Sequence, residues 1–144
     1  MNEELFKALT DKDDKKAYEV SKEIIAISSE SSEYYQDFET FYSLVNQKSS
    51  FQRARGFILC CSLARHDSEG KLARVFPIML KLLNDDKPTV VRQCLNALHE
   101  VVLYRPELSD EIKEALKGID LSKYKDSMTP LIEKDIKSLE SILI

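Results

Sequence analysis

The chain has 144 residues, a formal net charge of −4 and an apolar fraction of 43%, which suits one domain, 1–144, built around one core. With only 3 glycines and 4 prolines it is poor in the turns that a β-sandwich or barrel needs. No apolar run approaches membrane-spanning length, and the N-terminal segment 1–16 is acidic and amphipathic, unlike a signal peptide. We therefore expect a cytoplasmic, all-helical protein without a membrane partner.

The first two predicted elements are helical hairpins over 2–29 and 33–67, separated by the serine-rich segment 28–32. We call the two helices of each hairpin its A helix and its B helix. Apolar residues in steps of three and four mark the B helices, because that spacing places them on one stripe. The stripe of the first B helix is Ala17, Val20, Ile24 and Ile27. The same pattern recurs 37 residues later at Ala54, Phe57, Cys61 and Ala64.

The third hairpin, 69–105, follows Gly70 and repeats the stripe after another 37 residues. Its B-helix stripe is Val91, Cys94, Leu98 and Val101. Pro77 lies inside its A helix, "NDDKP" forms its turn, and Pro88 suits the first turn of the B helix. Pro106 is expected to end that helix, because the residue before a proline resists the α conformation.

The fourth hairpin, 107–143, keeps the stripe only after a one-residue shift. The shifted stripe is Ile132, Ile136, Leu139 and Leu143. Ser109 is predicted to cap its A helix and Gly118 to end it. Residues 120–127 are expected to form a loop or one loose turn, and Thr129-Pro130 the N-cap and first residue of the last helix. Four similar hairpins are typical of stacked repeats, since one hairpin cannot bury its apolar face alone.

Three cysteines, Cys60, Cys61 and Cys94, make an odd count. Adjacent cysteines on a helix point about 100° apart, which suits neither a zinc site nor a redox pair. We expect buried, reduced side chains that pack as small apolar residues.

The segment "VFPIMLKLLNDDKPTVVRQCLNALHEVV" (75–102) resembles the HEAT repeat family. It has a proline in the A helix (Pro77), Leu-Leu near that helix's end, an aspartate in the turn, and Val91-Arg92 opening the B helix. The resemblance is strongest over 70–105, and the 37-residue period is shorter than the ~40–47 residues usual for HEAT repeats. It implies an α-α superhelix of about four antiparallel hairpins, stacked with a right hand, that acts as a binding scaffold.

The resemblance also implies a side-chain ladder in which Arg92 binds the turn carboxylate of Asp86. An arginine fork can hold a carboxylate while its stem covers apolar surface. Arg55 occupies the matching place in the second hairpin, where Ser49 replaces the aspartate. Arg55 is expected either to reach Asp86 across the repeat boundary or to be free for a ligand.

The inner surface of such an array is formed by the B helices, so their polar flank is the predicted binding site for a protein partner, with an acidic partner as one option. The candidate residues are Tyr18, Lys22, Arg55, Leu59, His66, Arg92, Asn96, His99 and Leu103, with Ile25 and Ser62 on the same flank. Arg, Tyr and Leu are plausible interface anchors. Leu59 and Leu103 could instead only pack against the next repeat.

The alternative function is nucleic-acid binding or processing through the basic middle segment, 51–106. That segment carries nine Lys and Arg against five Asp and Glu, and phosphate binding needs such charges on one face. The basic residues on which this hypothesis rests are Arg53, Arg55, Arg65, Lys71, Arg74 and Arg92. Against it, Arg53 and Arg55 point about 200° apart on a helix.

The sequence contains no H-E-x-x-H, G-x-S-x-G, P-loop or G-x-G-x-x-G motif, and its acidic cluster at 11–14 lacks the glycine and spacing of a calcium loop. We therefore expect no catalytic residues, no metal site and no cofactor.

Overall fold

The computed structural model describes residues 1–143, which form α-helices and short 3-10 segments and contain no strand. The α-helices are α1 (Glu3–Leu9), α2 (Asp14–Ser28), α3 (Phe38–Ser43), α4 (Ser50–Ser62), α5 (Lys71–Met79), α6 (Pro88–Tyr104), α7 (Ser109–Lys117) and α8 (Thr129–Glu140). The 3-10 segments are Glu33–Asp37, Leu44–Asn46, Ala64–His66, Leu80–Asn84, Pro106–Leu108 and Leu121–Lys123. The all-α prediction is confirmed.

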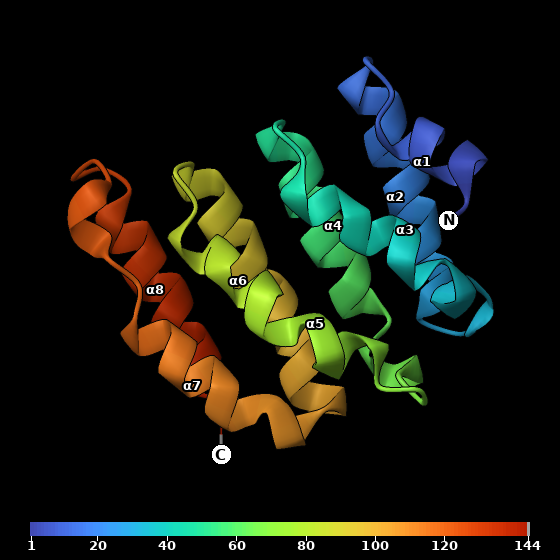
Figure 1. The fold of residues 1–144 in the computed structure, drawn as a ribbon. Coiled ribbons are helices and arrows are strands. Elements are labelled where there is room, and N and C mark those ends of the chain that lie inside the picture. The colour runs from blue at the N-terminus through green and yellow to red at the C-terminus, as the bar shows by residue number, and fades with distance from the viewer. Residues whose placement is uncertain (144) are drawn as a thin grey trace.

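The helices lie in two layers, with the two chain ends at opposite ends of the row (Figure 1). The predicted B helices α2, α4, α6 and α8 form one layer, in which each contacts the next along the chain. In the other layer α1 contacts α3, and α7 contacts the 3-10 segment that continues α5. Helices that are about 37 residues apart in sequence are therefore neighbours in space.

The repeated apolar stripe forms the core between these layers. In α2, α4 and α6 most of its members are buried, including Ile24, Phe57 and Leu98. In α8 the one-residue shift is confirmed, because Ile132 and Leu139 are buried. Burial of such side chains contributes about 1.5–3 kcal/mol each relative to exposure.

Helix boundaries follow the local signals in most places. Gly70 adopts the left-handed conformation (φ 69°) between the second and third hairpins, and Pro88 starts α6. α6 ends at Tyr104, before Pro106, and α7 ends at Lys117, before Gly118.

Two predicted caps are wrong by one residue. Ser109 and Thr129 are the first helical residues of α7 and α8, and Leu108 and Met128 occupy the N-cap positions. The 3-10 segment before α7 continues directly into that helix, so no free first turn is left for the Ser109 hydroxyl to cap. That hydroxyl has no hydrogen-bond partner within the described residues.

Cys60, Cys61 and Cys94 are buried and form no disulfide, as predicted. Burial raises the pKa of all three thiols well above the usual range, because a thiolate would lose its hydration there. Among the described residues, no helix is both long and apolar enough to span a bilayer.

Candidate functional site

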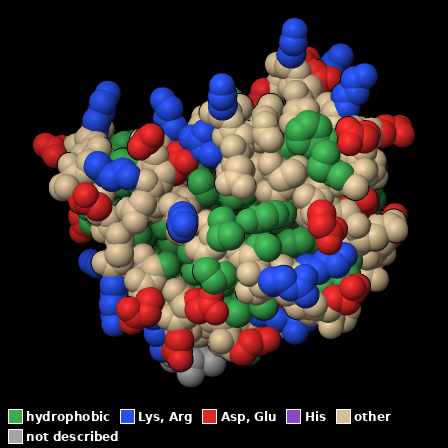
Figure 2. Space-filling model, viewed as in Figure 1, with side chains coloured by type: hydrophobic (Ala, Val, Ile, Leu, Met, Phe, Trp, Pro, Cys, Tyr) green, Lys and Arg blue, Asp and Glu red, His purple; other side chains and the backbone are tan. Residues whose placement is uncertain are grey.

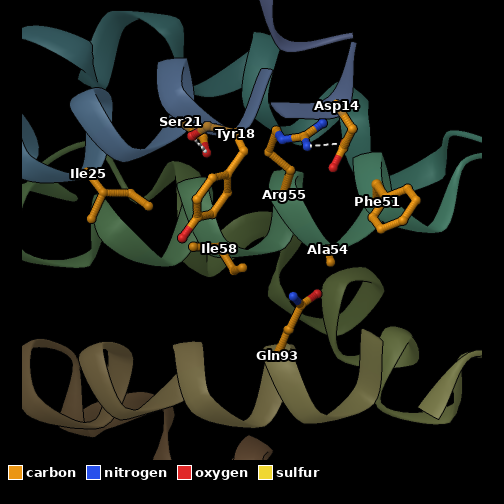
Figure 3. A pocket seen from close by; sticks show the side chains of 9 residues that line it. All are labelled: Asp14, Tyr18, Ser21, Ile25, Phe51, Ala54, Arg55, Ile58 and Gln93. Carbon is orange, nitrogen blue, oxygen red and sulfur yellow. Dashed lines mark hydrogen bonds and ion pairs between the residues drawn. The ribbon is translucent and has the colours of Figure 1, made fainter. Parts of the chain in front are cut away.

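A depression of about 210 Å³ opens on the B-helix layer where α2, α4 and α6 meet. In Figure 3 the side chains of Tyr18 and Ile25 extend from α2, and Gln93 rises from α6 on the opposite side. The α4 residues Phe51 and Ile58 also line it. The remaining lining residues are Asp14, Ser21, Ala54 and Arg55.

Two further depressions, of about 470 and 360 Å³, adjoin the first. Ile25 and Ile58 line both the first and the second, and Asn96 is shared by the second and third. The residues added by these two are Ser29, Cys61, Ser62, Arg65, Thr89, Arg92, Ala97, His99, Glu100 and Asp135. We call the combined depression the groove.

Bulky apolar side chains are exposed at the α2–α4 end of the groove. Tyr18 is 53% exposed and Phe51 is 65% exposed, while Ile25 and Ile58 are half-buried. The floor beside them carries the small residues Ala54 and Cys61. An exposed aromatic pair next to a shallow floor leaves apolar area that a partner could cover.

Arg55 is a buried structural residue, and neither predicted alternative describes it. Its guanidinium donates to the Asp14 carboxylate at 2.6 Å and to the carbonyl of Leu9 at 3.0 Å, and the residue is only 8% exposed. It does not reach Asp86. Arg55 thus holds the loop between α1 and α2 against α4 (Figure 3).

The predicted Arg92–Asp86 ladder is also wrong. Arg92 binds Asp135 of α8 through Nε at 2.6 Å and Nη2 at 3.3 Å. The turn residue that accepts an arginine is Asp85, which Arg53 of α4 binds through two nitrogens. Arg53 and Arg92 therefore each bind a residue that lies beyond their own helix, because a long arginine stem reaches further than the nearest turn.

Arg65 of the groove contacts both α6 and the end of α2. It donates to Glu100 at 2.8 Å and to the carbonyl of Ser29 at 2.6 Å, and its guanidinium lies 4.3 Å from the ring centroid of Tyr104. The hydrogen bond from Arg65 to Glu100 raises the pKa of this guanidinium. The sequence identified Arg65 only as part of the basic segment.

Of the other candidate residues, Leu59 is completely buried, so its predicted place on the exposed flank is wrong and its alternative packing role is the one observed. Leu103 is 67% exposed. The ring Nε2 of His66 lies 2.7 Å from the carbonyl oxygen of Ser28, beside the end of α2. Asn96 and His99 line the groove.

Lys22 is exposed on α2, and its amine lies 5.4 Å from the ring centroid of Tyr18. The structure therefore brings Tyr18, Arg55, Arg92, Asn96 and His99 to one groove, with Lys22 beside it.

Phe51, Ile58 and Gln93 were missed by the sequence reasoning. The sequence predicted that the side of α4 with Arg55 and Leu59 would be exposed. The side that opens to the groove is rotated from it by about one residue, or roughly 100°. Phe51 gave a usable signal, because a large apolar side chain that lies off the buried stripe has no core position to fill.

The other layer also exposes apolar side chains. Seen from the side of α5 and α7, a hydrophobic patch lies around α5 (Figure 2), where Ile78 is 46% exposed. This patch is the natural comparison surface for any test of the groove.

Within residues 1–143, no three His, Cys, Asp or Glu side chains come together as a metal site requires. Comparison of the chain with protein-family models, with curated proteins and with solved structures finds no match.

Proposed function

We propose that this protein is a non-enzymatic binding scaffold: a short, HEAT-like, right-handed superhelix of four hairpins that binds a protein partner in the groove of its B-helix layer. The recurring 37-residue stripe and the succession of contacts between α2, α4, α6 and α8 support the repeat architecture. The groove supports the binding role.

One observation carries the binding proposal: Tyr18 and Phe51 remain more than half exposed at the edge of a concave surface that three helices line. Aromatic side chains are frequent anchors at interfaces, because they bury a large area at low conformational cost. The polar residues Gln93 and Asn96 on the opposite wall can orient a bound chain.

The nucleic-acid alternative loses most of its physical basis. Among the basic residues on which it rests, Arg53, Arg55, Arg65, Lys71 and Arg92 each form an ion pair with a carboxylate of this chain. A phosphate would have to displace those carboxylates before counterion release could favour binding. The basic middle segment is therefore mostly neutralised in the folded protein.

Site-specific photo-crosslinking tests the proposal. A photoreactive phenylalanine analogue replaces Phe51 in the full chain, which is then irradiated in an extract of its native cells. The same analogue at Ile78 is the matched control, because both positions are exposed and apolar but lie on different layers. We expect a discrete protein adduct from position 51 that is absent from position 78.

Phe51→Ala in the unlabelled protein, added as competitor, should compete for that adduct less well than the wild type. An adduct from position 78 alone would overturn the proposed site, and a nuclease-sensitive adduct from position 51 would favour the nucleic-acid reading.

A further inference from the structure

The ionisable side chains that line the groove neutralise each other in pairs. Asp14 is paired with Arg55, Glu100 with Arg65, and Asp135 with Arg92. Each pair joins two different helical segments. Among the described residues, His99 is the one other Asp, Glu, Lys, Arg or His of the groove lining. The lining therefore offers a partner a neutral, largely apolar surface.

The rim at the aromatic end carries two exposed lysines of α2. Lys15 and Lys22 lie three residues before and four residues after Tyr18, which places both on its side of α2. Within residues 1–143, Lys15 forms no ion pair, and Lys22 makes only a 3.9 Å contact with exposed Glu19, which is worth little in water.

The acids of the nearby α1–α2 loop are occupied by backbone groups. Asp11 accepts a hydrogen bond from the N–H of Asp13, and Asp13 caps α2 by accepting from the N–H of Lys15. These bonds hold both carboxylates against the α1–α2 loop, whereas Lys15 and Lys22 lie on the Tyr18 side of α2.

The apolar side chains repeat at helical spacing on both helices. Tyr18 and Ile25 are seven residues apart on α2, and so are Phe51 and Ile58 on α4. Seven residues span two helical turns, about 10 Å. An α-helix whose own apolar residues recur at i, i+3 or i+4, and i+7 has the same repeat and can lie along them.

We propose that the occupant of the groove is an amphipathic α-helix of a partner protein, with an uncharged aliphatic stripe against Tyr18, Ile25, Phe51 and Ile58 and acidic residues beside that stripe facing Lys15 and Lys22. This inference rests on the proposed binding function and specifies the chemistry of the partner.

Peptide selection tests this chemistry without knowledge of the natural partner. A phage library of random peptides, each about four helical turns long, is selected on the full-length protein and depleted on Phe51→Asp. Enriched peptides should combine acidic residues with apolar residues at i, i+3 or i+4, and i+7. Synthetic versions should become helical on binding, as followed by circular dichroism, and their affinity should fall as salt rises.

Charge reversal supplies the matched control. Lys15→Glu combined with Lys22→Glu should weaken the acidic peptides about tenfold or more, and exchanging peptide Glu for Lys should restore binding. Lys81→Glu combined with Lys137→Glu changes the net charge equally but lies away from the groove rim, and it should change affinity less than about twofold.

Enrichment of basic, proline-rich or extended peptides, or equal affinities for the two double variants, would overturn the acidic-helix inference. The inference would also be overturned if no peptide were enriched on the wild-type protein after depletion on Phe51→Asp. If the adduct from position 51 still forms in those cases, the proposed binding function stands and only its partner class is wrong. If that adduct is also absent, both fail.

Discussion

At the scale of single residues, the arginines hold separate helices together. Arg55 is the most buried of them, and its two hydrogen bonds hold the α1–α2 loop. Arg92 has a comparable partner in Asp135, but its side chain is 37% exposed and the pair is open to solvent. The sequence pattern gave Arg92 the structural role and left Arg55 open to a ligand. Burial reverses this order for stability, because water screens the exposed Arg92–Asp135 pair and competes for its hydrogen bonds.

Arg55→Ala is expected to lower the free energy of unfolding by about 1–3 kcal/mol, since it leaves the carbonyl of Leu9 without its partner. Arg92→Ala should cost less than about 1 kcal/mol. Urea denaturation followed by far-UV circular dichroism measures both. Arg74→Ala serves as the control, because within residues 1–143 the one hydrogen bond of its side chain is a 3.4 Å contact with the carbonyl of Glu69. Equal losses for Arg55→Ala and Arg74→Ala would contradict the structural role of Arg55.

The cysteines give a second test at this scale. Because burial raises the pKa of Cys60, Cys61 and Cys94 and excludes reagents, native protein should react very slowly with a thiol reagent at mildly alkaline pH. Addition of denaturant should release three reactive thiols per chain. Fast modification of even one thiol without denaturant would show that the core opens there.

At the scale of elements, one close helix approach controls the second hairpin. A Cβ atom added at Gly56 of α4 would lie 2.7 Å from Leu44 Cβ, 2.8 Å from the Phe41 carbonyl oxygen and 2.9 Å from the Val45 nitrogen. These distances are well below van der Waals contact, and two of the three neighbours are backbone atoms that move only with their helix. Glycine at position 56 lets α4 lie directly on α3 and the 3-10 turn after it.

Gly56→Ala should therefore force α4 away from α3 and destabilise the fold by about 1–3 kcal/mol, although alanine is the better helix former. Gly118→Ala is the matched control, since its nearest contact would be an ordinary 3.5 Å, and it should change stability by less than about 0.5 kcal/mol. Thermal unfolding of the two variants and of the wild type measures these differences in stability. A Gly56→Ala protein as stable as the wild type would mean that the helices separate easily.

At the scale of the whole molecule, helices that are neighbours in space are held by polar hydrogen bonds as well as by the core. Arg105, at the end of α6, donates to the carbonyl of Ala64 after α4. Asn84, before α6, donates to the carbonyl of Gly118 after α7 and accepts from the N–H of Asp120. Each B helix thus depends mainly on the helices beside it in its layer.

The rates of amide hydrogen exchange should reflect how many neighbouring helices each helix has. Amides of α4 and α6 should exchange most slowly, because each of these helices is flanked on both sides in its layer. Amides of α1 and α8 should exchange faster through opening of the terminal hairpins. Mass spectrometry of peptides from the native protein measures this directly, and uniform protection from α1 to α8 would show one cooperative unit instead.

The sequence by itself determined the elements of this protein. Helical periodicity placed the B-helix stripes correctly, including the one-residue shift to Ile132 and Leu139, because burial of one face is a local property of spacing. Pro88, Pro106 and Gly118 marked helix ends for equally local reasons.

Only the tertiary structure decided what the polar side chains do. The carboxylate partners of Arg55, Arg65 and Arg92 lie 35–43 residues away in sequence, so no local pattern could identify them. Leu59 is buried and Ile58 is half-buried, although they lie only about 100° apart around α4. Which of the two faces the groove depends on the rotation of α4 about its axis, and the packing of α4 between α2 and α6 sets that rotation. The sequence thus predicted where the B helices lie, whereas the rotation of each helix and the reach of each arginine determined which residues face the groove.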